Sequence, residues 1–266
     1  MFLTKKALFK IWFITITYAV FGVIWFLMPI VHTALRSDSV RYVVFGIIFL
    51  LLSVFFYKWG RFAEGKGKLL SKGKKLIHYE LRPAEFIRLY EESRDCPDNV
   101  ISKPDFDVLW VVLSAYDVLD DVEREFEALE QMSIVAPEKK KPLVKILKAS
   151  MLFDKGRTEE AESLYFEVLN GKKDLTTMAT LDVLAKCDRA KAMGDYATAE
   201  AYYRQKLIKS FPKNTPLDII LARFSLAEIC CKTDRKEEAK EHFNYCVENG
   251  GETSMASTAR EMLEKL

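Results

Sequence analysis

The sequence predicts an all-α protein, built from an N-terminal helical hairpin and an array of antiparallel helix pairs. Three observations support this fold class. Apolar residues beyond residue 76 recur at helical spacing, helix start signals such as Thr215-Pro216 punctuate them, and turn residues return at a nearly constant interval. Sustained period-two alternation, which is typical of strands, is almost absent from the sequence.

Two apolar stretches lie within the first sixty residues. Residues 11–31 contain no charged side chain, and as a helix they would span about 31 Å, the thickness of a hydrocarbon core. Residues 42–57 would span about 24 Å, and Lys58 could snorkel to the interface. We therefore expect a transmembrane helical hairpin. A cleaved signal peptide followed by a core helix is the alternative, but the first run is longer than a signal core.

The distribution of cations predicts the orientation of this hairpin. Lys5, Lys6 and Lys10 precede the first span, and seven lysine and arginine residues follow the second one within residues 58–75. Because cytoplasmic flanks carry the excess of Lys and Arg, both termini are expected in the cytoplasm. The expected localisation is a two-span integral membrane protein, by default of a bacterial inner membrane.

Charge is divided unevenly along the chain. Residues 1–75 carry 12 Lys and Arg against 2 Asp and Glu, whereas the remaining residues carry 28 against 36. An acidic domain is a poor ligand for phosphate backbones, so no nucleic-acid partner is expected. The basic run either sets topology or contacts anionic head groups of the lipid bilayer. Its candidate lipid-contacting residues are Lys66, Lys68, Lys72, Lys74 and Lys75.

Three segments of the acidic part share one spacing. A turn residue is followed five positions later by alanine and nine positions later by an aromatic residue. The turn residue permits a sharp reversal, the alanine lets two helices approach closely, and the aromatic residue lies on the same helix face. The three sets are Gly156, Ala161 and Tyr165; Gly194, Ala199 and Tyr203; and Asp234, Ala239 and Phe243.

This pattern resembles the tetratricopeptide repeat, in which helix pairs stack into a superhelix. Small residues stand seven positions before each turn residue, at Ala149, Cys187 and Ala227, where that family needs them. The resemblance covers residues 140–266 and, more faintly, 104–139, where Val122 stands in the alanine place. The alanines are 38 and 40 residues apart, against 34 in the family, so a less regular α-solenoid is the alternative.

The predicted organisation has three parts. Residues 1–60 form the two-helix membrane anchor, 61–103 a basic juxtamembrane segment with a linker helix, and 104–266 the repeat domain, closed by a capping helix near the C-terminus. The resemblance implies a groove lined by the first helix of each pair. Its candidate partner-binding residues are Ser150, Phe153, Asp154, Asp188, Lys191, Glu228 and Lys232.

Catalytic and metal-binding motifs find little support. His242 and Cys246 share a helix face, but two ligands do not make a metal site. Residues 60–67 resemble a phosphate-binding loop, yet Gly67 stands where Ser or Thr is needed. The acidic residues between Asp117 and Glu125 read as a solvated helix face. We therefore expect no cofactor, no metal and no enzymatic activity.

The function expected from these patterns is that of a membrane-anchored cytoplasmic scaffold or adaptor. Its helical-repeat groove would bind a peptide or helix of a partner protein, which the sequence does not identify. Two alternatives remain open: a structural subunit of a larger membrane assembly, and an enzyme whose site is not readable from the sequence.

Overall fold

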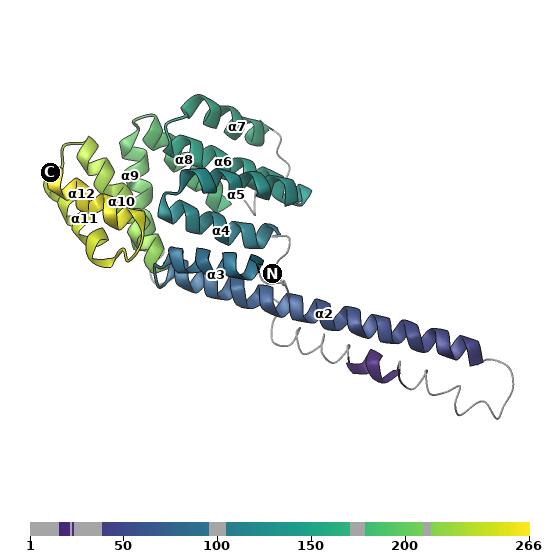
Figure 1. Cartoon of the computed structure of the whole chain (residues 1–266). Coiled ribbons are helices and arrows are strands. Elements are labelled where there is room, and N and C mark those ends of the chain that lie inside the picture. Colours follow the sequence, from purple (N-terminus) through teal and green to yellow (C-terminus); the bar gives the residue numbers. More distant parts are fainter. Residues whose placement is uncertain (1–15, 22, 24–38, 96–104, 171–178, 210–213) are drawn as a thin grey trace. The chain divides into compact units, whose positions relative to one another are not determined.

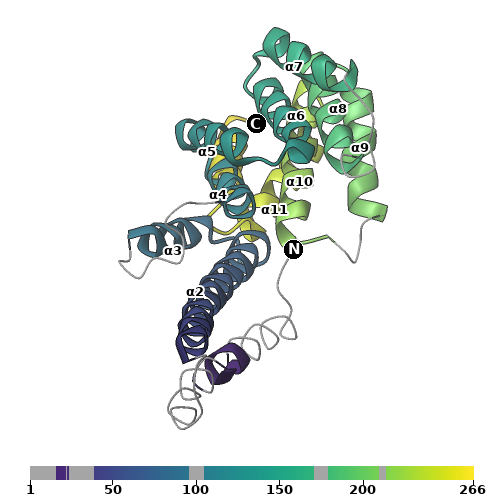
Figure 2. The same ribbon diagram turned by 90° about the vertical axis from the view of Figure 1, so that its right-hand side faces the viewer.

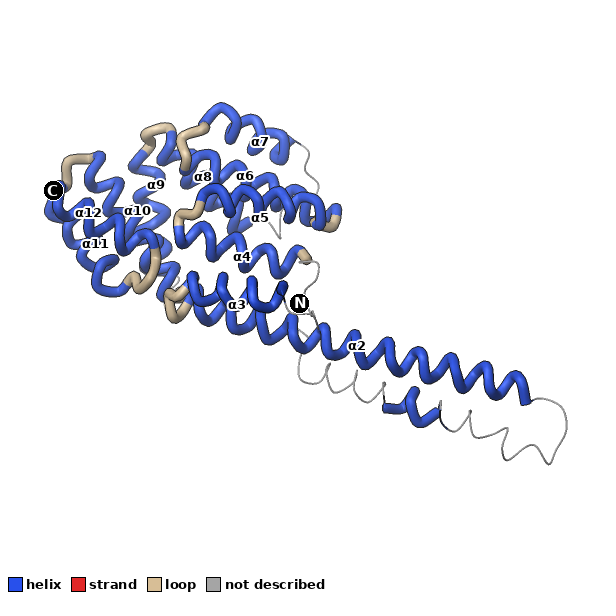
Figure 3. Tube along the Cα trace, viewed as in Figure 1, coloured by secondary structure: helices blue, strands red, loops and turns tan. Residues whose placement is uncertain are grey.

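The fold is all-α, and Figures 1 and 3 show it as a succession of helices. The computed structural model describes residues 16–21, 23, 39–95, 105–170, 179–209 and 214–266, and it contains no strand within these ranges. The helices are α2 (Ser39–His78), α3 (Pro83–Asp95), α4 (Phe106–Leu119), α5 (Val122–Val135), the 3-10 turn η1 (Glu138–Lys140), α6 (Lys141–Asp154), α7 (Thr158–Asn170), α8 (Ala179–Ala192), α9 (Tyr196–Lys209), α10 (Pro216–Lys232), α11 (Lys236–Asn249) and α12 (Ser254–Lys265).

The chain divides into two compact units, one made of Met1–Ser71 with Glu91–Ser102 and the other of Lys72–Tyr90 with Lys103–Leu266. In the first unit, the Tyr18 ring stacks on the rings of Phe49 and Phe56, with centroids 5.7 and 5.5 Å apart. These contacts join residues 16–21 to α2. Many apolar side chains of this unit remain exposed, among them Ile16, Val20, Phe21, Ile47, Leu51, Val54 and Phe55.

The prediction of a two-span integral membrane protein is wrong. Among the residues described, no helix has both the length and the apolar composition needed to cross a membrane. The first predicted span, 11–31, lies outside the described residues except for 16–21 and 23. The second, 42–57, belongs to α2, which continues without a break into the lysine-rich stretch. Its 16 apolar-rich residues rise only about 24 Å before the charges begin, which is short of a hydrocarbon core of about 30 Å.

In the second unit, consecutive helices pack in pairs: α4 with α5, α6 with α7, α8 with α9, and α10 with α11. Neighbouring pairs pack on one another through α6 and α8 (Figure 2), through α5 and α6, and through α9 and α10. The helix starts follow the sequence signals. Thr215 caps α10 in a capping box with Asp218, and Asp105 caps α4 by accepting hydrogen bonds from the backbone amides of Asp107 and Val108.

A turn joins the two helices of each pair, and the four turns share one geometry. Gly156, Gly194 and Asp234 have left-handed backbones, with φ of 72°, 78° and 57°, which confirms them as turn residues. Asp120, with φ of 56°, makes the fourth turn. In every case the amide after the turn residue donates to the carbonyl five positions earlier, a Schellman bond that satisfies the end of the first helix. These bonds run Asp121 to Tyr116, Arg157 to Leu152, Asp195 to Ala190 and Arg235 to Cys230, at 2.8–3.0 Å.

The predicted packing positions of three pairs are confirmed. Ala161, Ala199 and Ala239 are completely buried, and their partners Tyr165, Tyr203 and Phe243 are buried with them. The first pair departs from the prediction. Counting five residues from the Asp120 turn places Glu125, and not Val122, at the position that alanine fills elsewhere. The first pair therefore has a buried glutamate at this position.

The two ends of the array meet. The last helix, α12, packs on α11 and also contacts α4, and the Ser254 hydroxyl donates to the Val118 carbonyl at 3.0 Å. The Glu252 amide donates to the Leu81 carbonyl at 2.9 Å. A Cβ at Gly251 would lie 2.8 Å from that same carbonyl oxygen, so only glycine permits this approach. The C-terminal helix thus buries Met255, Ala256 and Ala259 while it touches the first pair.

We predict that Ala199→Leu destabilises the fold by about 2 kcal/mol, because extra methylenes at a fully buried helix contact force the pair apart. Ala201→Leu is the matched control, since Ala201 lies on the same helix and is exposed. Urea unfolding would measure both. Equal midpoints for the two variants would contradict the packing role of Ala199.

Candidate functional site

A pocket of about 450 Å³ opens between the first helices of three consecutive pairs, α6, α8 and α10. Gly156 in the turn between α6 and α7 and the first residues of α7 and α9 complete its wall. Its lining combines aromatic and aliphatic side chains with carboxylates and amines. The lining residues are Phe153, Asp154, Gly156, Thr158, Asp188, Lys191, Ala192, Tyr196, Glu228, Ile229 and Lys232.

The residues that the sequence predicted for a groove come together at this pocket. Six of the seven line it: Phe153, Asp154, Asp188, Lys191, Glu228 and Lys232. The seventh, Ser150, lies one turn deeper on α6, and its hydroxyl donates a hydrogen bond to the Asp188 carboxylate. They converge because α6, α8 and α10 are the first helices of three consecutive pairs.

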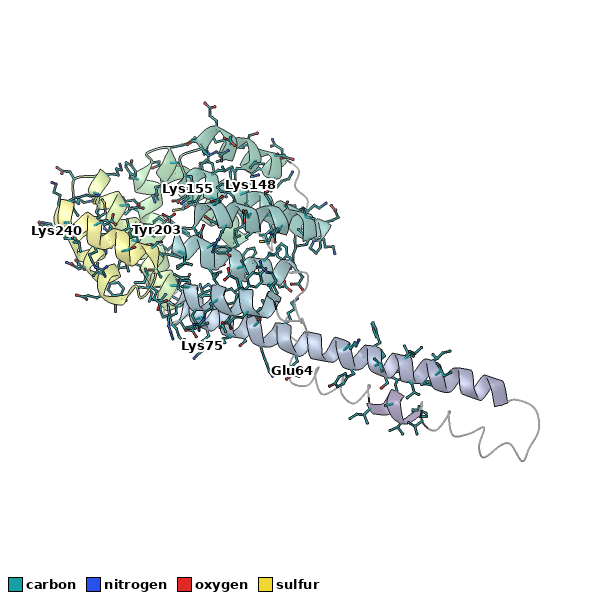
Figure 4. All side chains as sticks on the ribbon, in the orientation of Figure 1. Glu64, Lys75, Lys148, Lys155, Tyr203 and Lys240 are labelled. Atoms are coloured by element: carbon teal, nitrogen blue, oxygen red, sulfur yellow. The ribbon has the colours of Figure 1, made fainter. Side chains whose placement is uncertain are left out.

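Two lysines connect carboxylates of consecutive pairs. The Lys191 Nζ lies 2.5 Å from Glu228 Oε2 and 4.0 Å from Asp154 Oδ1. The Lys155 Nζ lies 2.7 Å from Asp120 Oδ1 and 3.7 Å from Asp154 Oδ2. Figure 4 labels Lys155, just past the end of α6. Burial disfavours both charged amines, but these carboxylates outweigh burial and raise the pKa of each lysine. Both lysines are therefore engaged within the array.

Sequence reasoning missed Asp117, Asp120 and Lys155, although a signal was present. Asp117, Asp154, Lys191 and Glu228 stand at three successive intervals of 37 residues. They lie near the C-terminal ends of α4, α6, α8 and α10, so a constant interval brings charged side chains to equivalent places in adjacent pairs. This interval is a more regular marker of the groove than the spacing of the alanines.

Three carboxyl groups near the groove have no lysine in ion-pair contact among the described residues: Asp117, Asp188 and Glu125. Burial is the main reason that the pKa of Asp188 rises to about 7 and that of Asp117 to about 6, and the nearby Asp154 adds to both. The Asp117 side chain still reaches solvent, so water weakens the effect of burial there. The groove thus holds more acid groups than its own amines neutralise.

Glu125 is the most unusual of these groups. The residue is only 3% exposed. The charges that act on it belong to Asp117 and Asp154, near the ends of α4 and α6, and to Asp120 and Lys155 in the turns that follow. Burial first, and then the charge of Asp117, raise the pKa of Glu125 to about 8. The prediction that this acidic run is a solvated face is therefore wrong for Glu125.

The predicted lipid-contacting lysines lie elsewhere, on α2. Lys66 and Lys68 belong to the first unit and Lys72, Lys74 and Lys75 to the second. Lys68 pairs with Glu64 at 2.8 Å, and Lys75 pairs with Glu80 at 2.5 Å. None of the five lines the pocket.

Chemically, the pocket offers carboxylates, amines and aromatic faces on a fixed frame. No group of three or more His, Cys, Asp and Glu side chains is arranged to hold a metal ion in the part of the chain that the structure describes. His242, one half of the weak metal pair considered from the sequence, is buried, and its Nδ1 lies 3.2 Å from the Arg223 guanidinium.

Compared with known proteins, the chain matches no family model, no curated protein and no solved structure.

We predict that Glu125→Gln makes the fold less sensitive to alkaline pH. Folding raises the pKa of Glu125 from 4.5 to about 8, so the folded chain keeps a proton that the unfolded chain releases. Stability from this group is therefore present at pH 4.5 and is lost as the pH rises toward 8. The amide, which carries no charge, should make the variant more stable than the natural chain at pH 9 by on the order of 1–3 kcal/mol.

Urea unfolding at pH 5 and pH 9 would measure this difference. Glu123→Gln is the matched control, because Glu123 lies on the same helix and is exposed. The two variants should differ at pH 9 and agree closely at pH 5. A natural chain and a Glu125→Gln variant with the same pH dependence would refute the buried-acid assignment.

Proposed function

We propose that this chain is a protein–protein interaction module of the tetratricopeptide-like kind, which binds a segment of a partner protein in the pocket between α6, α8 and α10. The observation that carries the proposal is convergence. Side chains at corresponding places on three consecutive first helices line one open pocket. Helical-repeat modules bind their ligands on this inner surface.

The regularity of the helix pairs supports the tetratricopeptide-like assignment. Each of four pairs has a left-handed turn residue and the same Schellman bond, and three have alanine and an aromatic residue at the expected positions. The interval of 37 residues between equivalent charged positions is close to the 34 of that family. Pairs of this kind cannot bury their apolar faces alone, so they stack and leave the inner surface free for ligands.

The pocket has the size and lining of a site for peptide side chains. A volume of about 450 Å³ falls in the range of ligand sites, and it suits a few side chains of an extended or helical segment. Phe153, Tyr196 and Ile229 provide apolar contact, while the carboxylates and amines provide direction. Because Lys191 is held by Glu228 and Asp154, the lining is ordered before a ligand arrives, which lowers the entropic cost of binding.

A random peptide library displayed on phage and selected against the full chain would test this function. We predict that selected peptides lose affinity by about tenfold or more when Ala192→Trp fills the pocket, since Ala192 lies in its wall. Ala201→Trp, an exposed position on α9, is the matched control and should change affinity less than about twofold.

Thermal melting would establish that both tryptophan variants fold like the natural chain. If no peptide were enriched, or if enriched peptides bound the two tryptophan variants equally well, the proposed groove function would be excluded.

A further inference from the structure

We propose that the first unit binds the surface of an anionic lipid layer, with its exposed apolar side chains among the acyl chains of one leaflet and its lysines at the head groups. The contact involves no crossing of the layer. None of the residues concerned lines the pocket, so lipid binding is independent of the peptide-binding function. Three features support lipid as the occupant: the exposure of the apolar side chains, their spread around α2, and the lysines that follow them.

The first unit exposes large apolar side chains to an unusual degree. Leu51 and Phe55 of α2 are 64% and 61% exposed, and Phe21 of the segment before it is 49% exposed. Residues 42–57 contain no charged side chain, so no charge interrupts this surface. Contiguous apolar patches of this kind are rare on soluble monomers and mark sites that bind another surface. The first unit therefore needs a cover that the described residues do not supply.

The exposed side chains extend around more of α2 than one partner helix covers. Phe49 and Phe56 stack on Tyr18, so they mark the face of α2 that is turned to the preceding segment. At about 100° per residue, Val54 and Leu52 mark the edges of an exposed apolar arc of about 160° on the remaining side. A helix packed on one partner presents an apolar stripe of roughly 100°. Fluid acyl chains can cover the wider arc, because they adapt to any shape.

Cations follow this apolar surface directly. Residues 58–71 carry four Lys and Arg against one Glu. Lys58 is exposed, and the side chain of Lys68 is 76% exposed although it pairs with Glu64 at 2.8 Å. Such a pair at the surface is weak, so lipid phosphates can compete for Lys68. Each lysine close to anionic head groups should strengthen binding about fivefold.

Charge and length distinguish this contact from a second copy and from a membrane span. A second copy would bring the same lysines toward Lys58 and Lys68, whereas anionic head groups neutralise them. Residues 42–57 rise about 24 Å, short of a hydrocarbon core of about 30 Å. Such a helix can instead lie in the interface, with its apolar side about 5–10 Å below the head groups and its lysines extended to them.

Co-sedimentation of the full chain with vesicles would test this lipid contact, using phosphatidylcholine alone or mixed with phosphatidylglycerol. We expect binding to both, about tenfold tighter on the anionic vesicles, with a difference that falls as salt increases. Leu51→Glu should weaken binding about tenfold or more, because it removes apolar contact and places a charge among acyl chains. Lys58→Gln combined with Lys68→Gln should reduce the preference for anionic vesicles about tenfold.

Ile134→Glu is the matched control, because Ile134 is 81% exposed on α5 in the second unit and receives the same change. It should change vesicle affinity less than about twofold. Circular dichroism would establish that all variants keep the helical fold. A chain that sediments with neither vesicle or that shows no preference for the anionic one, or equal binding by the Leu51→Glu and Ile134→Glu variants, would overturn the lipid contact.

Self-association offers a second test of the same surface. Dimers that form without lipid, that Leu51→Glu abolishes and that vesicles fail to dissociate would show that a second copy covers α2, and would equally overturn the proposal. Analytical ultracentrifugation of the full chain and of the Leu51→Glu variant would detect them. We expect no such dimer in the presence of anionic vesicles.

Discussion

The second unit depends on a close contact between the two helices of each pair. A residue in the left-handed region reverses the chain, and the side chain five positions later lies between the helices. Alanine fills this place in three pairs, and the short distance it permits sets where the aromatic residue packs and where the next pair can stack. The inner surface follows from that stacking, because helices of nearly equal length bring corresponding positions into line. The pocket is a consequence of this repeated contact.

Much of this could be predicted from residue spacing, because the physics is local. Gly156 and Gly194 mark turns by their freedom to adopt positive φ, and alanine with an aromatic residue four positions on marks one helix face. The fourth turn could not be predicted, because aspartate adopts the left-handed conformation less commonly than glycine and so does not mark Asp120 as a turn residue. In addition, Glu125 stands where the other three pairs have alanine. The extent of α2 was also missed. The residues after Tyr57 change from apolar to lysine-rich, but the backbone hydrogen bonds of a helix do not depend on whether side chains are apolar or charged, so α2 continues.

Part of the candidate groove could also be predicted from residue spacing. A position on a first helix can be inferred from periodicity, and six residues chosen in this way line the pocket. The electrostatic state of those residues could not be inferred, because it depends on partners from other pairs. Lys155 pairs with Asp120, 35 residues away in sequence, and Asp188 with Ser150, 38 residues away. A run of acidic residues looks solvated in sequence, and only the packing of α4, α5 and α6 shows which carboxyl is enclosed.

The contact between α12 and α4 changes how the helix pairs of the array are coupled to one another. In an open solenoid each repeat feels only its neighbours, so unfolding can begin at either end and advance one unit at a time. Here Ser254 is bonded to Val118, and Glu252 to Leu81, so the terminal units are neighbours as well. The helix pairs therefore form a closed ring of contacts. When the contact between two neighbouring pairs opens, each of these pairs is still held by its neighbour on the other side. A ring of this kind has no free end from which unfolding can start. Inserting a further repeat would separate α12 from α4 and so break the contact that closes the ring.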